Sequence, residues 1–489
     1  MKILFVYSSD EVQSRKKPLK TPEQMHFGIS YISSLLKKNN HKTKLIVLSR
    51  IFEEKNKKTI DDSLENFCPD VICFTSVSTQ YPFIVKMAKY IKKKYPKIFL
   101  LIGGPHVSLN PEGVLSEGFD AVCIGEGEYP SLELVSQLEK NKFPSHIKNL
   151  WIKKDKKIEK NPPRPFLQNL DQLPFPDRKM WEEWTNNQSY SRYAILLGRG
   201  CPFQCAYCCN HAFKKLASGK YTRLRSSNNI LDEIKEIKEK FPSEKEIYFE
   251  VENFGIDQKW AINLCSKLEE FNKTLKHPLF FGANLRITPN ASLENLFIAC
   301  KKANFKSLNI GLESGSERIR SQILRRNYSN EDIINAVKLA RKYELQISLF
   351  NMIGLPTETF NDFKETVIVN RKCVPDGHFT SIFFPYPGTD LYSLCKKKGL
   401  LKKPLNNKME RSKAVLDLPE FSKKQIQKSY IWFDYYIYKG KKPLGEILLS
   451  VLLSEIRSKS ILNYLYRRIM DLAFFQWTKK RIKKIMGLR

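Results

Sequence analysis

The chain has 489 residues, which is more than a single hydrophobic core usually organises, so we expect two or three domains. Its 42% of hydrophobic and 12% of aromatic residues are those of an ordinary globular protein. A formal net charge of +32 would suit a nucleic-acid partner, but much of the lysine excess is spread evenly over predicted helix faces, so we expect no such partner.

The cysteines and the N-terminus favour a reducing compartment. Eleven cysteines are scattered along the chain, and their odd number does not fit the paired framework of a secreted disulfide protein. The apolar run at residues 3–7 is too short for a signal peptide and predicts a first strand. We therefore expect a cytoplasmic protein with reduced thiols.

Strands and helices alternate over residues 1–140 in the pattern of a doubly wound, Rossmann-like sheet. Ligands of such sheets bind beyond the carboxyl ends of the strands, where the loops 75–79, 103–106 and 125–128 should cluster. No Gly-x-Gly-x-x-Gly turn follows the first strand, which argues against a dinucleotide. The predicted strands are 2–7, 44–48, 71–76, 99–102 and 121–124, with helices over 28–38 and 82–94.

Residues 141–190 are predicted to be a linker between domains. Residues 151–158 are compatible with a small lysine-rich hairpin. The stretch at 161–178 is dense in proline and should have no regular structure.

Residues 191–400 repeat strand, loop and helix about six times, which predicts a partial (β/α)6 barrel of the TIM type. In such barrels the chemistry lies at the carboxyl ends of the strands. Ser329 and Asp332 predict a capping box that starts one of the outer helices. The predicted strands are 193–197, 246–251, 279–285, 307–312, 346–351 and 380–384.

Three closely spaced cysteines, Cys201, Cys205 and Cys208, follow the first barrel strand. Three thiolates can hold three irons of a cubane cluster, whereas a structural zinc site or an electron-transfer cluster uses four ligands. The trio therefore predicts one iron that is open to another ligand, with chance clustering of small core residues as the alternative. Cys209 is expected to be a packing residue, because adjacent side chains rarely reach the same cluster face.

This loop resembles that of the radical S-adenosylmethionine (radical SAM) enzymes, since Gly198-Arg-Gly200 precedes it and the aromatic Tyr207 precedes the third cysteine. In that family the open iron binds S-adenosylmethionine, and one-electron cleavage releases a 5′-deoxyadenosyl radical. The runs YFEVENFGID, LNIGLESGSERI and FNMIGLPTET, at the second, fourth and fifth strand ends, extend the resemblance.

The resemblance implies contacts to S-adenosylmethionine from these strand ends. Glu252 is expected to meet its ammonium group, although Val251 stands where the family usually has a first acid. Glu313 lies between two glycines that would admit the ligand, and a carboxylate suits a hydroxyl or ammonium group because it accepts two hydrogen bonds. The expected set is Tyr207, Glu252, Asn253, Glu313, Ser314, Arg326 and Gly354.

Three arginines are candidates for the basic contact to S-adenosylmethionine. Arg326 matches the family residue that pairs with the methionine carboxylate, and Arg325 competes for that role. Arg286, at the close of the third strand, is a further basic candidate, with a structural ion pair as the alternative.

The N-terminal loops resemble the cobalamin-binding domain that precedes the cluster domain in one large radical SAM subfamily. The runs GGPHVSLNPE and FDAVCIGEGEYP carry the match, and their small residues would let a flat corrin approach the backbone. The Asp-x-His-x-x-Gly signature is missing, so His106 is expected to be a loop histidine and the cobalamin to bind with its lower base displaced. The expected contacts are Thr75, Ser76, Ser78, Gly103, Gly104, Pro105, His106, Gly125, Glu126 and Gly127.

Residues 401–489 are predicted to form a helical, basic C-terminal region. Charged residues interrupt the apolar runs 444–456 and 461–477, so no transmembrane helix is expected. Residues 478–489 hold six basic residues and no acidic one. The region either packs against the barrel or makes peripheral contact with a membrane surface, and both fates stay open.

Together these features predict a cobalamin-binding radical SAM enzyme that holds a [4Fe-4S] cluster and receives electrons from a flavodoxin or ferredoxin. The favoured activity is methyl transfer to an unactivated carbon of a small-molecule or lipid-like metabolite. Ring closure and rearrangement stay open, since some members of the subfamily perform them. The sequence names neither a general base nor an oligomeric state.

Two other functional classes fit less well. An RNA-modifying enzyme of the methylthio-transferring kind would show additional cluster cysteines in its N-terminal domain, where only Cys68, Cys73 and Cys123 lie. A non-catalytic redox or cobalamin sensor would not need the expected S-adenosylmethionine contacts.

Overall fold

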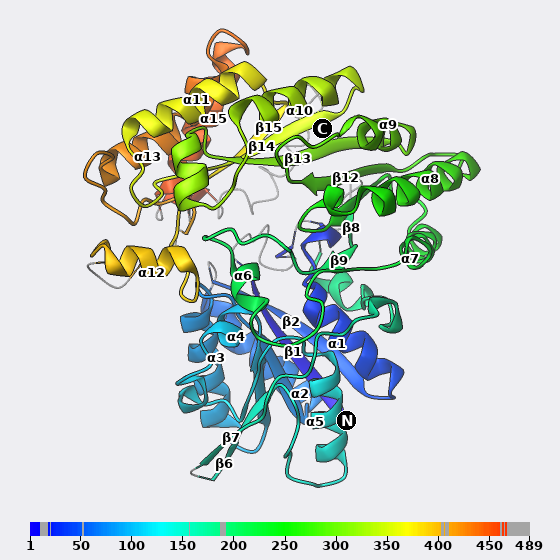
Figure 1. Ribbon diagram of the computed structural model, residues 1–489. Coiled ribbons are helices and arrows are strands. Elements are labelled where there is room, and N and C mark those ends of the chain that lie inside the picture. The colour runs from blue at the N-terminus through cyan, green and yellow to red at the C-terminus, as the bar shows by residue number, and fades with distance from the viewer. Residues whose placement is uncertain are drawn as a thin grey trace.

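Two largely parallel sheets, one in each half of the chain, organise the computed structural model (Figure 1). The first sheet lies in the lower part of that view and the second in the upper part. The structure describes residues 1–9, 18–19, 21–50, 53–155, 157–185, 192–401, 405, 410–459, 462–463 and 465–466.

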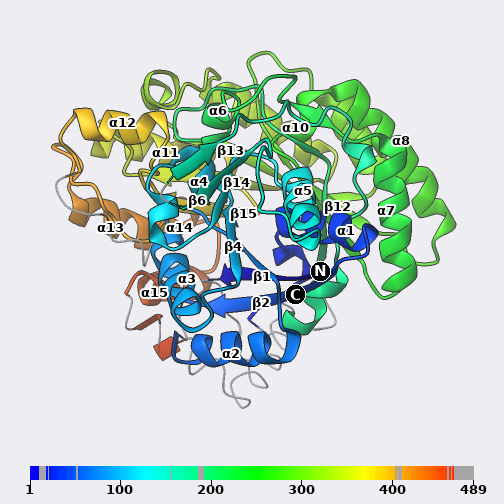
Figure 2. The same ribbon diagram turned by 90° about the horizontal axis from the view of Figure 1, so that it is seen from below.

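The first half of the chain folds into a sheet with helices on both faces. Its elements are β1 (Lys2–Ser9), α1 (Phe27–Lys38), β2 (Lys42–Ser49), α2 (Asn56–Phe67), β3 (Val71–Thr75), α3 (Tyr81–Lys94), β4 (Phe99–Gly103), α4 (Pro105–Leu109), β5 (Ala121–Cys123) and α5 (Glu128–Glu139). The five strands are parallel in the order β2-β1-β3-β4-β5. They are short, buried apolar runs, as parallel strands covered on both faces require. One face packs on α1 and α5 and the other on α2 and α3 (Figure 2), which confirms the predicted Rossmann-like fold.

A hairpin extends the far edge of this sheet. Strands β6 (Leu150–Lys154) and β7 (Lys157–Lys160) form the hairpin predicted near residues 151–158. Strand β6 also pairs antiparallel with β5, so the hairpin belongs to the first sheet and its assignment to a linker is wrong. The physical reason is that β5 would otherwise present an open edge of unpaired backbone groups.

The second half of the chain forms the predicted partial barrel. Its strands are β8 (Arg192–Leu196), β11 (Glu246–Glu250), β12 (Phe280–Leu285), β13 (Phe305–Glu313), β14 (Gln346–Ile353) and β15 (Gly377–Ile382), all parallel in the order β15-β14-β13-β12-β11-β8. Its outer helices are α7 (Ser227–Lys240), α8 (Gln258–Thr274), α9 (Glu294–Lys302), α10 (Asn330–Lys342) and α11 (Phe360–Cys373). The capping box of Ser329 and Asp332 starts α10 as predicted. Strands β8 and β15 do not pair with each other, so the barrel stays open on one side.

The segment that connects the two halves is irregular, as its prolines predict, and it is tied to both. Asp177 accepts a hydrogen bond from Ser33 Oγ at 2.6 Å and pairs with Lys37, and both partners lie on α1. The next residue, Arg178, donates to the backbone oxygen of Ala194 in β8 at 2.7 Å and pairs with Glu233 of α7. These contacts fix the barrel relative to the first sheet.

The C-terminal region is helical, as predicted. It contains α12 (Asp390–Lys397), α13 (Lys423–Ile431), α14 (Phe433–Tyr438) and α15 (Leu444–Ser458). These helices share an apolar core with the ends of β14 and β15. Among the described residues, no helix is long and apolar enough to cross a membrane. The predicted basic tail at 478–489 lies outside the described residues, as does most of the 461–477 run.

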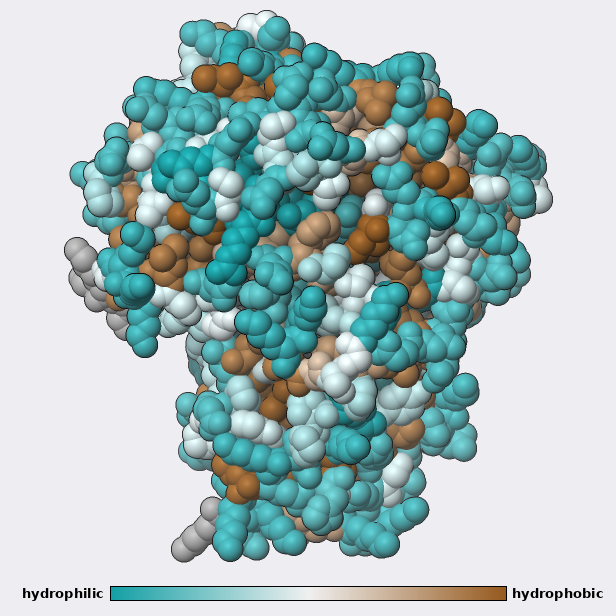
Figure 3. All heavy atoms as spheres, in the orientation of Figure 1, coloured by the Kyte–Doolittle hydropathy of each residue, from teal (hydrophilic) through white to brown (hydrophobic). Residues whose placement is uncertain are grey.

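Hydrophilic side chains cover most of the face seen in Figure 3, with apolar residues scattered among them. This distribution fits the sequence-based expectation that charged residues, 27% of the chain, lie mainly on solvated surfaces.

Candidate functional site

The cysteine loop leaves the barrel at the carboxyl end of β8. The short strand β9 (Gly198–Arg199) pairs with β10 (Arg223–Leu224) directly before the first cysteine. A Cβ atom at Gly198 would lie 2.4 Å from the backbone oxygen of Arg223, and one at Gly200 would lie 2.2 Å from that of Tyr221. The two glycines noted in the sequence are therefore needed for the loop to return close to the strand.

The three predicted cluster ligands lie on this loop, and the sulfur atoms of two of them lie near polar N–H groups. Cys205 is buried, while Cys201 and Cys208 are partly exposed. Arg286 Nη1 donates to Cys205 Sγ at 2.7 Å, and Asn210 Nδ2 lies 3.7 Å from Cys208 Sγ. The basic candidate Arg286 thus contacts a cysteine. Such N–H groups stabilise thiolates, so this donor set fits an iron–sulfur cluster held by three cysteines.

A raised pKa keeps the thiols of Cys201 and Cys208 protonated in the absence of metal. Burial, together with the nearby Glu252 carboxylate and the other two cysteines, raises the pKa of Cys201 to about 11. A hydrogen bond with Cys209, together with burial, raises the pKa of Cys208. Binding of iron would therefore displace protons, as it does in other cysteine sites.

Cys209 is placed differently from its prediction as a packing residue. It follows Cys208 at the start of the short helix α6 (Cys209–Phe213) and is partly exposed. Its side chain lines a cavity together with Cys208. The structure therefore places Cys209 beside Cys208 in a cavity wall rather than in a fully buried core.

A second group brings Tyr207, Glu313 and Arg326 together behind the cysteines. Arg326 Nη1 donates to Glu313 Oε1 at 2.7 Å and to Tyr207 Oη at 2.8 Å. The Arg326 Nε is buried and has no hydrogen-bond partner among the described residues. An orphaned guanidinium hydrogen fits a carboxylate ligand, as the predicted role of Arg326 requires.

The two glycines that flank Glu313 serve a different purpose from the one expected. A Cβ atom at Gly311 would lie 2.4 Å from Glu313 Oε1, and one at Gly315 would lie 2.4 Å from the backbone of Thr366 in α11. They make room for the Arg326–Glu313 pair and for a helix. The space beside these glycines, which was expected to admit a ligand, is therefore filled by other parts of the protein.

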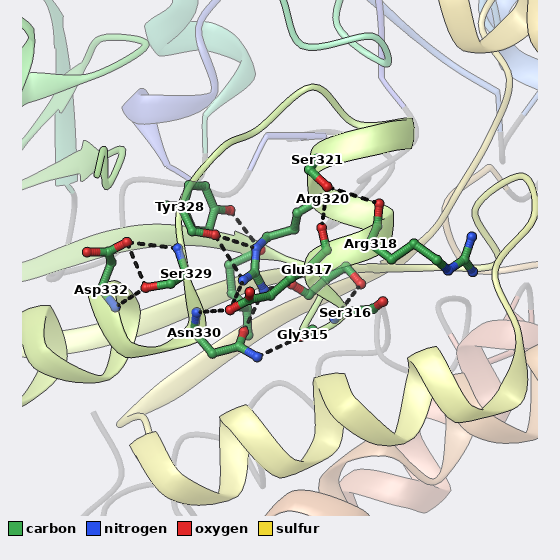
Figure 4. A network of polar contacts seen from close by, with 12 residues as sticks. Gly315, Ser316, Glu317, Arg318, Arg320, Ser321, Tyr328, Ser329, Asn330 and Asp332 are labelled. Carbon is green, nitrogen blue, oxygen red and sulfur yellow. Dashed lines mark hydrogen bonds and ion pairs between the residues drawn. The ribbon is translucent and has the colours of Figure 1, made fainter. Parts of the chain in front are cut away.

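Arg320, which sequence reasoning missed, fixes the loop that carries Arg326 (Figure 4). Its side chain is fully buried and donates to the backbone oxygen of Ser314 at 2.5 Å, to Asn330 Oδ1 at 2.6 Å and to the backbone oxygen of Tyr328 at 3.0 Å. No local pattern distinguishes Arg320 from the arginines around it. Only its tertiary contacts reveal it.

The remaining expected contacts to S-adenosylmethionine hold loops in place. Asn253 Oδ1 accepts hydrogen bonds from the backbone N–H groups of Gly255 and Arg286. Ser314 is fully buried, and its Oγ accepts from the N–H of Ser316. Gly354 has a φ of +77° and packs against Ile426 of α13. The structure therefore groups Tyr207, Glu252, Glu313 and Arg326 near the cysteines, with Asn253, Ser314 and Gly354 in supporting positions.

A cavity of about 410 Å³ lies where the two halves meet. Ser78, Pro105 and His106 line it from the first half, and Tyr207 and Cys208 line it from the barrel. The wall between them is largely apolar, formed by the aromatic residues Phe350, Phe379, Phe383, Phe384 and Tyr386.

His106 lines this cavity from the first turn of α4, so it is not in a loop as predicted. Its Nδ1 lies 3.1 Å from Ser78 Oγ, and its ring centroid lies 4.3 Å from that of Tyr81. Burial lowers the pKa of His106, so the ring is neutral at pH 7.

A second cavity, of about 250 Å³, lies under the loops of the first sheet. Of the ten residues expected to bind cobalamin, nine line one of the two cavities. Ser76 lines neither, and its N–H donates to the oxygen of Gly103 at 3.1 Å. The residues at the second cavity are Thr75, Gly103, Gly104, Gly125, Glu126 and Gly127.

Two of these residues have structural partners that the sequence did not indicate. Gly104 has a φ of +98°, and a Cβ atom there would lie 2.7 Å from Thr75 Oγ1, so this glycine is needed for the packing of the loops themselves. Glu126 pairs with Arg199 and Arg223 of the barrel. Although burial opposes it, these two arginines hold the pKa of Glu126 below its usual value.

Comparisons with known proteins match the two halves separately. A B12 binding domain model matches residues 23–135, and a Radical SAM superfamily model matches residues 195–368. The chain is 28% identical to an uncharacterized methyltransferase of Pyrococcus horikoshii, over 88% of this chain and 92% of that protein. It is 24% identical to the anaerobic magnesium-protoporphyrin IX monomethyl ester cyclase of Rubrivivax gelatinosus, over 74% of this chain and 65% of that protein.

Among solved structures, the fold is similar to the cobalamin-dependent S-adenosylmethionine radical enzyme OxsB with aqua-cobalamin and S-adenosylmethionine bound. The TM-score is 0.68 at 15% identity, over the whole of this chain and 75% of that one.

Proposed function

Since the chain belongs to the radical SAM enzymes that carry a B12-binding domain, we propose that it transfers a methyl group to an unactivated carbon of a small-molecule or lipid-like substrate. Its cofactors are a [4Fe-4S] cluster, S-adenosylmethionine and cobalamin. When bound, they supply a radical that removes a hydrogen atom and the methyl group that takes its place. We expect the enzyme to act in the cytoplasm with a flavodoxin or ferredoxin as electron donor.

The observation that carries this proposal is the shared cavity between the halves. Residues from the first-sheet loops and from the cysteine loop line a single space of about 410 Å³. A substrate there would lie within reach of both sets of loops at once. Two reactive groups that act on one carbon need this proximity.

Different side chains would bind the cluster and S-adenosylmethionine in this proposal. Cys201, Cys205 and Cys208 would hold the cluster. Arg326 and Glu313 would orient S-adenosylmethionine through hydrogen bonds and charge.

The cavity lining would hold the corrin and the substrate. The small and polar first-half residues that line the two cavities would bind cobalamin. Phe350, Phe379 and Phe384 make the opposite wall apolar and would keep water away from a reactive radical.

Anaerobic reconstitution tests this function directly. Reduced wild-type protein should produce 5′-deoxyadenosine, and Cys201→Ala should abolish it because one iron loses its ligand. Cys68→Ala, at an exposed position of the first half, is the matched control and should retain the wild-type rate. Production of 5′-deoxyadenosine by Cys201→Ala at the wild-type rate would contradict the assignment.

The similarity to a cyclase favours ring closure as a second candidate. The two activities differ in a by-product, because methyl transfer consumes an additional S-adenosylmethionine as methyl donor and releases S-adenosylhomocysteine. Turnover that yields comparable amounts of 5′-deoxyadenosine and S-adenosylhomocysteine supports methyl transfer. Turnover that yields 5′-deoxyadenosine alone supports the cyclase.

A further inference from the structure

Exposed apolar side chains gather in the C-terminal helical region. Of the eleven large apolar residues that are exposed among the described residues, six lie between positions 444 and 465. Single exposed apolar residues are ordinary, whereas a cluster of them is typical of a surface that contacts a partner. Helix α15 carries four of the six, which are Leu444, Leu448, Leu449 and Leu452.

Helix α15 buries one apolar side and presents another to solvent. Ile447 and Val451 are buried, and Ile447 belongs to the core that the C-terminal helices share with β14 and β15. Leu444, Leu448 and Leu452 are spaced by four residues, so they form a row along the helix, and each is 45–56% exposed. We call this row, with Leu449 beside it, the leucine face.

Packing on the barrel does not explain the leucine face. A helix that only packs on a core carries polar residues on its solvent side. The charged residues of α15 are Glu446, Glu455 and Arg457, and Glu455 pairs with Lys459 at 2.7 Å. None of them replaces a leucine in the row, so the solvent side of α15 is more apolar than its contacts within the protein require.

Basic residues flank the leucine face at both ends. Lys439 and Lys441 precede α15, are exposed, and form no ion pair with a carboxylate of the described residues. Arg457 and Lys459 stand at its other end and are also exposed. Residues 439–459 hold five basic residues and two acidic ones, so the surroundings of the face are cationic.

This charge decides between the partners that an apolar face could have. Leucines edged by cations are typical of a helix that lies in the interface of an anionic membrane, where lysines meet lipid phosphates. A twofold dimer would place the same patch against itself and bring the lysines of both copies together without added acids. Among the described residues no helix can cross a membrane, so such a contact is peripheral.

We propose that the leucine face of α15, with Lys439 and Lys441, docks the protein on an anionic membrane surface. Docking of this kind goes beyond the proposed reaction and does not depend on it. The sequence left open whether the C-terminal region packs on the barrel or contacts a membrane. On this proposal α15 does both, since Ile447 faces the core and the leucine face meets the lipid.

Flotation of the reconstituted, full-length holoenzyme with lipid vesicles tests the proposal. Vesicles made of equal parts of phosphatidylcholine and phosphatidylglycerol should carry the protein upward in a density gradient. Vesicles of phosphatidylcholine alone should carry much less, and added salt should release the protein from the mixed vesicles, because salt screens the lysines.

Two double variants separate the apolar contribution from the charge. Leu448→Gln with Leu452→Gln should weaken binding to the mixed vesicles about tenfold, since two half-exposed leucines no longer leave water. Lys439→Gln with Lys441→Gln should weaken it about tenfold as well and reduce its dependence on salt. Both should keep the melting temperature of the wild type, because the side chains they replace are exposed.

Phe143→Gln with Ile158→Gln is the matched control. These residues are 49% and 48% exposed, and Ile158 lies on β7, at the opposite end of the molecule from α15 in Figure 1. The control should bind the mixed vesicles as the wild type does.

The proposal is overturned if the wild type does not float with the mixed vesicles, or floats equally with both kinds. It is also overturned if the leucine variant floats like the control. A dimer in sedimentation velocity that the leucine variant converts to a monomer, without vesicle binding, would assign the face to a second copy instead. Vesicle binding requires neither substrate nor cleavage of S-adenosylmethionine, so these results are independent of the proposed function.

Discussion

The two halves of the molecule hold their functional loops in different ways. In the first half, small residues and backbone hydrogen bonds pack the loops against each other, as between Gly104 and Thr75. In the barrel, charged side chains pair across the site, as in Arg326 with Glu313. The first half should therefore be sensitive to added volume, and the barrel to the loss of a charge.

The largest effect is expected from breaking the buried ion pair of the barrel. Arg326→Met keeps the side-chain volume but leaves Glu313 without its partner, which should lower the free energy of unfolding by about 4 kcal/mol. Arg325→Met removes an exposed pair with Asp390 and should cost less than about 1 kcal/mol. Denaturant unfolding measures both. Equal losses for the two variants would show that burial does not set the strength of this pair.

Adding a methyl group to a glycine tests whether the first half is sensitive to added volume. Gly104→Ala combines a positive φ with a contact of 2.7 Å and should cost about 3 kcal/mol, together with loss of cobalamin retention on gel filtration.

Gly113→Ala separates strain from volume. Gly113 has a φ of +78° with no atom within 4 Å, so the substitution should cost about 1 kcal/mol and preserve cobalamin binding. If the two alanine variants behave alike, backbone strain rather than packing explains the glycine at position 104.

The smallest effect is expected from Glu126, whose ion pairs with Arg199 and Arg223 join the first half to the barrel. Because Arg199 and Arg223 lower the pKa of Glu126 below 4.5, its stabilisation is present above that value and is lost as the pH falls through the lowered pKa. Glu126→Gln should lower stability by about 1 kcal/mol at neutral pH and remove this part of the acid sensitivity.

The melting temperature as a function of pH measures this effect. Glu133→Gln, which breaks an exposed pair with Arg164, should leave the pH profile unchanged. A Glu126→Gln profile parallel to that of the wild type would contradict the role of Glu126.

The strands could be predicted because buried parallel strands are apolar runs between turns. Even so, β1 ends at Ser9 rather than at residue 7, and β13 begins at Phe305 rather than at 307, since strand ends depend on pairing. The attachment of β6 to β5 could not be predicted, because it joins an edge that only the folded sheet creates.

In the site, too, some features could be predicted from the sequence and others could not. Tyr207, Glu313 and Arg326 were predicted from motifs and lie together. Arg320 was not, because its partners Ser314, Tyr328 and Asn330 meet it only once the loop around it has folded. The cavity position of Cys209 was not, because the other walls of that cavity come from segments distant in the chain. The sequence also did not indicate that Gly104 packs against Thr75 or that Gly311 leaves room for Glu313 and Arg326, since it shows that a residue is small but not what fills the space beside it.

The central claim is that three cysteines hold a cluster with one iron open to S-adenosylmethionine. Electron paramagnetic resonance of the anaerobically reconstituted, reduced protein tests it most directly. The account predicts a [4Fe-4S] signal that changes when S-adenosylmethionine is added and that is lost in Cys201→Ala. A signal that S-adenosylmethionine leaves unchanged, or a protein that binds zinc in place of iron, would contradict it.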